Sequence, residues 1–296
     1  MKAAKSLFEK NNKYGKDVQE RYKSNQKDAK KKVDDIRNAV TKEARLTEHI
    51  KVSSEQARDS LKTIKAMLSE HSETIDVKIG VPQTIDPDSQ GFSTVEKTND
   101  ALSGLISKDV VESLDSVSIE LHDKKKYRAS YSEKTSKINL GKNEMATWDV
   151  GTIAHEMGHA LEYHGELLDA AIGFLMSLTD ADGFDYITKI ADTSHDLNEV
   201  GHPDDFGKLY ERISQLEVWT DAGQVFPPKE RGATASAAYN GKIYLNARRG
   251  EWKVRSTEIF SMGLENLTQN PVAFAEYDPD YFNFMIASLL GYHSKK

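Results

Sequence analysis

Apolar residues recur at helical steps along the first quarter of the chain, where most other positions are polar. These apolar positions lie three or four residues apart in two runs: Val33, Ile36 and Val40, then Ala57, Leu61, Ile64 and Leu68. So narrow an apolar stripe predicts helices that pack on a partner helix or along a larger body. Residues before about position 30 carry few apolar anchors, and we expect them to be frayed when alone. The pattern therefore predicts a helical arm over residues 1–75, with coiled-coil character.

The pattern changes after this arm. Pro82, Pro87 and Gly91 interrupt any regular element between residues 76 and 91, which predicts a linker there. The following part, residues 92–296, mixes the two periodicities, and the period-two run at Val117, Ile119 and Leu121 predicts a strand.

Further elements are expected along this second part. Strands are expected at 127–131 and 137–140, helices at 94–105, 148–162, 167–178, 204–218, from about 256 and at 279–290, and a hairpin with an Asn240-Gly241 turn within 237–245. The fold class predicted is α+β, with a small, mostly antiparallel sheet preceded by the helical arm.

The charges are unevenly distributed along the chain. Residues 1–75 hold 18 Lys+Arg against 12 Asp+Glu, whereas the rest of the chain holds 22 against 35. A basic arm can bind nucleic acid, but here the lysines are interspersed with acidic residues, which is typical of a solvated helical surface. Nucleic acid is therefore not the expected partner.

Two absences narrow the chemistry. The chain has no cysteine, which excludes disulfides and thiolate zinc sites, so a transition metal would need histidine and carboxylate ligands. The N-terminus lacks the apolar core of a signal peptide, and no stretch has the length and hydropathy of a membrane span. A soluble protein is expected.

The run His155–His159 (HEMGH) carries the strongest chemical signal. Two histidines four residues apart on a helix lie on one face, so both imidazoles can bind one Zn²⁺ ion. Glu156 lies beside them, where a carboxylate can act as general base on a water activated by the metal. Thr147 or Asp149 can cap the helix. The competing interpretation is a helix with two incidental histidines.

A catalytic zinc needs a third protein ligand. An elongated HExxHxxGxxH pattern would have a histidine at position 165, which is Gly165, and His164 is out of register with the metal face. Glu166 and Asp169 lie too far along the chain, roughly 10–15 Å from His159. The third ligand must therefore come from another element.

The best candidate for that ligand is Glu258. It lies in the mostly apolar run 255–267, where a buried acid must be paired or bound to metal. Glu265 lies seven residues later on nearly the same helical face, where it can orient a metal-binding histidine. The alternative for Glu258 is an exposed first-turn acid that the helix dipole stabilises.

Five segments together resemble a known family. They are residues 131–140 and the runs IAHEMGHALEY, YNGKIYLN, STEIFSMGLENL and DPDYFNFMIASLLG. Over roughly residues 92–292 the chain resembles the zincin-type zinc metallopeptidase domain appended to Mu-type minor head proteins of tailed phages and also met in bacterial toxins. The resemblance implies a gluzincin-like site, with His155, His159 and Glu258 as zinc ligands and Glu156 as base.

The resemblance does not extend to residues 1–75, where a minor head protein would carry its capsid-binding part. The arm is shorter and more polar than such a part. The chain is then either a C-terminal piece of a longer protein or a zincin joined to a different adaptor.

Three functions fit these residues. The first is a zinc peptidase acting on a protein or peptide, with the arm as anchor to a virion or capsid partner. The second is a virion protein that keeps the zincin fold as a scaffold with little turnover, and the third is a toxin domain delivered into a cell. The expected location is the virion or the host cytoplasm. Only catalysis requires Glu156 as base.

The group that stabilises the oxyanion is not assigned by the sequence. Tyr239, Tyr244 and His164 have suitable side chains, although structural roles are favoured for each. His195 and His202 lie in an acidic polar segment, for which a plain solvated loop is the expected interpretation.

Overall fold

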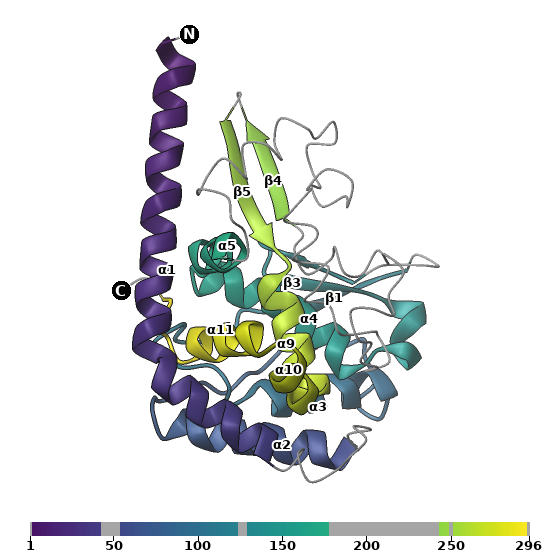
Figure 1. The fold of residues 1–296 in the computed structure, drawn as a ribbon. Helices are drawn as coiled ribbons and strands as arrows, with labels where there is room; N and C mark the ends of the chain where they lie inside the picture. Colours follow the sequence, from purple (N-terminus) through teal and green to yellow (C-terminus); the bar gives the residue numbers. More distant parts are fainter. Residues whose placement is uncertain (1, 43–53, 124–128, 178–242, 249–250, 295–296) are drawn as a thin grey trace, which may run out of the picture. The chain divides into compact units, whose positions relative to one another are not determined.

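The computed structural model describes residues 2–42, 54–123, 129–177, 243–248 and 251–294, and over these the protein is α+β and mostly helical (Figure 1). In chain order the elements are α1 (Lys2–Lys42), α2 (Ser54–Ser69), α3 (Gln90–Leu102), β1 (Ser118–His122), β2 (Ser130–Ser132), β3 (Lys137–Gly141), the 3-10 helix η2 (Lys142–Thr147), α4 (Val150–His164), α5 (Leu168–Ser177), β4 (Ile243–Arg248), β5 (Glu251–Thr257), α9 (Ile259–Gln269), α10 (Pro271–Tyr277) and α11 (Pro279–Leu289). None of the described helices is long and apolar enough to cross a membrane.

The chain divides into two compact units, which do not separate at the predicted linker. Unit 1 comprises residues 1–29 and 168–259, and unit 2 comprises 30–167 and 260–296. The segment 76–91 belongs to unit 2, where Val77, Ile79 and Ile85 are buried. Its backbone joins the surrounding structure, because Gly80 N donates to Val117 O at 2.8 Å. The prolines therefore shape a packed, irregular segment of the core.

The main sheet of unit 2 is mixed. Its strand order is β1-β3-β2, with β1 parallel to β3 and β2 antiparallel to β3. The three strands lie close to the predicted positions, but the parallel β1–β3 pair departs from the expected mostly antiparallel sheet. Ile119 lies opposite Ile138 in this pair, and both are buried. The β1–β3 pair thus contributes buried apolar side chains to the core, and β3 contacts α4.

Helix α4 follows the sheet through η2 and begins where the sequence predicts a cap. The Asp149 carboxylate accepts a hydrogen bond from Thr152 N at 2.7 Å, which satisfies one of the unpaired amides of the first turn. One side of the helix is buried and contacts α3, β2 and β3. Its buried residues include Ile153, Ala154, Met157, Ala160 and Leu161. Burial of this apolar stripe fixes which side of α4 carries the histidines.

Three C-terminal helices complete unit 2. Asn270 caps α10 and Asp278 caps α11, each by accepting a hydrogen bond from the backbone N–H three residues later. The Phe274 ring contacts Tyr281 and Phe282, with centroid separations of 5.0 and 5.5 Å. Helix α10 also packs on α2. The aromatic contacts thus hold α10 and α11 together, and α10 joins this pair to α2 of the predicted helical arm.

Unit 1 contains α5 and the β4–β5 hairpin, which pack on one another. Within this unit, Arg21 pairs with Asp169 at 3.0 Å, and the Tyr22 ring meets Phe174 with centroids 6.3 Å apart. Strand β5 runs to Thr257, so the helix expected from about residue 256 begins at Ile259 instead. The predicted Asn240-Gly241 turn and the helix at 204–218 lie outside the described residues.

Candidate metal centre

His155 and His159 lie one turn apart on α4, as their spacing predicts. Their ring centroids are 5.3 Å apart, and the rings meet edge to face at 83°. Both side chains are partly exposed, whereas the neighbouring positions Ala154, Met157 and Gly158 are buried. The two imidazoles therefore project from the one accessible face of an otherwise buried helix.

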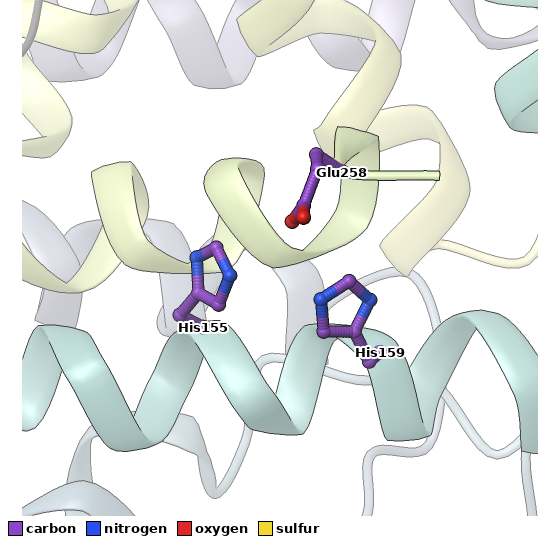
Figure 2. A group of neighbouring side chains, drawn as sticks. All are labelled: His155, His159 and Glu258. Atoms are coloured by element: carbon purple, nitrogen blue, oxygen red, sulfur yellow. The ribbon is translucent and has the colours of Figure 1, made fainter. Parts of the chain in front are cut away.

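Glu258 joins these histidines from another part of the chain. It lies between the end of β5 and the start of α9, and its side chain is 0 % exposed. Among the described residues, His155, His159 and Glu258 form a group whose ligand atoms all lie within 4.8 Å of one another. Figure 2 shows the carboxylate directed toward the two imidazoles. The sequence thus named all three members of the group, although Glu258 precedes α9 and does not lie in its first turn.

Glu265 completes the surroundings of His155. Its Oε2 atom lies 3.0 Å from His155 Nδ1, and both side chains are largely buried. With the proton on Nδ1, the imidazole donates to this carboxylate and presents Nε2 to an ion. This contact confirms the expectation that Glu265 orients a histidine of the motif.

Glu156 is buried on α4, with 4 % of its surface exposed. It directly follows His155 and precedes His159 by three residues, so its carboxylate leaves the helix beside the face that carries the imidazoles. A buried carboxylate at this position is suited to exchanging a proton with a molecule held at the histidines.

His164 belongs to a different contact at the end of α4. Its Nε2 atom lies 3.0 Å from Tyr131 Oη and 3.5 Å from Ser136 Oγ. Burial lowers the pKa of His164, and burial likewise raises the pKa of Tyr131. A neutral imidazole can accept a hydrogen bond from the Tyr131 hydroxyl, so this contact fastens β2 to the C-terminal end of α4.

The remaining residues named from the sequence lie elsewhere. Asp169 pairs with Arg21. Tyr239, His195 and His202 lie outside the described residues, as does the side chain of Tyr244, whose backbone belongs to β4.

The donor set suits zinc. Two imidazole nitrogens and one carboxylate oxygen are a combination found in catalytic zinc sites, which leave a fourth position open. Tetrahedral coordination with bonds of about 2.0–2.1 Å places ligand atoms about 3.4 Å apart, so small side-chain rotations bring atoms within 4.8 Å into one coordination sphere. A fully buried carboxylate next to two imidazoles is also the kind of charge that a cation stabilises.

Two contributions escaped the sequence prediction. Gly158 has no side-chain functional group, yet the backbone of Phe260 and Ser261 lies directly against it. The sequence signal for such a role is the glycine inside a helix. Glycine there costs about 1 kcal/mol relative to alanine, so its presence suggests that packing requires it. Tyr131 and Ser136, which contact His164, left no signal in the sequence because their neighbours come from other elements.

Comparisons with models of protein families, with curated proteins and with solved structures found no match for this chain.

Proposed function

We propose that the chain is a zinc-dependent metallopeptidase with a gluzincin-like site in a zincin-like domain. The observation that carries the proposal is the convergence of His155, His159 and Glu258, from two distant segments, within 4.8 Å. The 3.0 Å contact between His155 and Glu265 adds support, because metal-binding histidines characteristically donate their second ring nitrogen to such a partner.

The residues divide the chemistry among them. His155, His159 and Glu258 hold the ion, and Glu258 neutralises one of its two positive charges. A bound Zn²⁺ ion supplies Lewis acidity, which polarises a peptide carbonyl and makes water a nucleophile at neutral pH. Glu156 accepts a proton from the attacking water as the new C–O bond forms. Glu156 then delivers that proton to the amide nitrogen as the C–N bond breaks.

The partner proposed for the site is a protein or peptide. By its resemblance to phage minor head domains, the chain is proposed to act in the virion or in the host cytoplasm, with residues 1–75 as the anchor to a virion partner. The alternative functions are a virion scaffold with little turnover and a toxin domain delivered into a cell.

The test compares the wild type with Glu156→Gln, which keeps the shape of the side chain but removes its basicity. Both proteins, loaded with one equivalent of zinc, are incubated with a peptide library whose products are identified by mass spectrometry. We expect Glu156→Gln to retain zinc and to lose about 10²–10⁴-fold in cleavage rate. Glu166→Gln, an exposed acid just beyond α4, is the control and should cleave like the wild type.

Two results would contradict the proposal. One is equal cleavage by Glu156→Gln and the wild type. The other is a zinc-loaded wild type that cleaves no peptide of the library, which would favour the scaffold role.

A further inference from the structure

Helices α4 and α9 lie against each other in antiparallel directions. Gly151, near the start of α4, faces Gln269 at the end of α9, and His155 contacts Glu265 one turn further along. Gly158 then faces Phe260 and Ser261 in the first turn of α9. The contact position moves back along α9 as the chain advances along α4, so the two helices meet in opposite directions at these three places.

The approach is closest at Gly158. A Cβ atom built there would lie 2.4 Å from both Phe260 O and Ser261 Cα, whereas ordinary contacts begin at 3.4 Å. Both obstacles are backbone atoms, so no side-chain rotation can make room. Any side chain at position 158 therefore requires α9 to move away from α4 by about 1 Å.

This contact lies beside the proposed metal ligands on both segments of the chain. Gly158 immediately precedes His159, and Phe260 follows Glu258 by two residues. The start of α9 is thus fixed against α4 by a contact within unit 2, and the short connection from Phe260 determines where the Glu258 carboxylate can lie. Zinc–ligand bond lengths vary by only about 0.2 Å, so rotation of the Glu258 side chain would have to make up a backbone displacement of about 1 Å, at a cost in zinc affinity.

We infer that Gly158 is a positioning residue of the metal centre, because its missing side chain lets α9 approach α4 closely enough to bring Glu258 to His155 and His159. The inference rests on the metal centre of the proposed function, but not on turnover.

Gly151 provides a matched control on the same helix and against the same partner. A Cβ atom there would lie 2.0 Å from Gln269 Nε2 and 2.8 Å from its Cδ. These atoms form the far end of a flexible side chain, which can rotate away while the backbone of α9 stays in place. Gly151→Ala therefore adds the same methyl group to the same interface without moving Glu258.

The experiment measures zinc affinity by competition with a chromophoric chelator, for Gly158→Ala and Gly151→Ala in the wild type and in a Glu258→Ala background. Gly158→Ala should weaken zinc binding at least about 10-fold, the loss typical of disturbed ligand support, and Gly151→Ala less than about 3-fold. In the Glu258→Ala background Gly158→Ala should change the affinity less than about 3-fold, because the ligand it positions is gone.

Three outcomes would overturn the inference. They are wild-type affinity in Gly158→Ala, an equal loss in Gly151→Ala, and a loss in Gly158→Ala that persists without Glu258. A wild type that binds zinc but cleaves nothing would contradict the proposed function and leave this inference intact. A wild type that binds no zinc would contradict both.

A second variant applies if Gly158→Ala does not fold, as judged by far-UV circular dichroism without metal. One alanine inserted between Glu258 and Ile259 keeps the contact of Phe260 with Gly158 but displaces the carboxylate by about 3–4 Å. This variant should have wild-type helix content and at least about 10-fold weaker zinc binding. Unchanged affinity would show that the α4–α9 contact does not set the position of Glu258.

Discussion

His155 Nδ1 and Glu265 Oε2 lie 3.0 Å apart, one on α4 and the other on α9. The contact fixes the ring of His155 and the proton it carries, so the imidazole is oriented before any ion arrives. It also ties the histidine to the helix that follows Glu258. The same interface therefore orients one proposed metal ligand, His155, and adjoins another, Glu258.

Replacing Glu265 should weaken the metal centre without removing a ligand. We expect Glu265→Ala to lower zinc affinity about 10–100-fold, because His155 loses the carboxylate that orients it. Glu265→Gln should lose less, since its amide oxygen can still accept from Nδ1–H. Isothermal titration calorimetry with zinc measures both, and wild-type affinity in Glu265→Ala would contradict the orienting role.

The cap of α4 should contribute to stability independently of the metal. Asp149→Ala should lower the free energy of unfolding of the zinc-free protein by about 1 kcal/mol, because Thr152 N loses its acceptor. Asp149→Asn should be nearly neutral, since asparagine is an equally good cap. Urea unfolding followed by circular dichroism compares the two, and equal losses would show that the carboxylate acts through something other than the cap.

Asp278 should make the protein less stable as the pH rises. Burial raises the pKa of this carboxyl group from 3.8 to about 7. The folded state therefore favours its protonated form, and the stability it contributes is complete below pH 3.8 and lost as the pH rises to about 7. Asp278→Asn keeps a capping side chain and should be more stable than the wild type at pH 8, by about 4 kcal/mol at most. Urea unfolding at pH 4 and pH 8 tests this, and an advantage that does not shrink at pH 4 would contradict it.

His293 should act in the opposite direction. Burial lowers the pKa of His293 from 6.5 to about 4, and its ring lies against Phe284 with centroids 5.4 Å apart. The folded state therefore favours the neutral imidazole, so stability is complete above pH 6.5 and falls as the pH drops to about 4. His293→Gln should lose this acid sensitivity, which amounts to about 3 kcal/mol at most. Unfolding midpoints at pH 4.5, 5.5 and 7 that fall as steeply as those of the wild type would refute this role.

The parts of the structure that local chemistry determines could be predicted from the sequence. The spacing of His155 and His159, the cap at Asp149 and the apolar positions of α4 all act within one helix, and the structure reproduces them. Glu258 could be predicted as well, because an acid in an apolar run needs a partner.

The parts that depend on long-range pairing could not be predicted. The parallel pairing of β1 with β3 and the extension of β5 to Thr257 are set by partners that no local pattern shows. The segment 76–91 was misleading for another reason: its prolines suggested a linker, whereas the period-two spacing of Ile75, Val77 and Ile79 reflects their burial. Gly158 contributes only the absence of a side chain, and its role depends on the position of α9, which no local pattern shows.

The most direct test of the central claim is an anomalous difference map measured at the zinc edge from crystals of the full chain grown with one equivalent of zinc. The account predicts one dominant peak, about 2.0–2.2 Å from a nitrogen of His155, a nitrogen of His159 and an oxygen of Glu258. A dominant peak bound by other residues, or no peak at these three side chains, would contradict it.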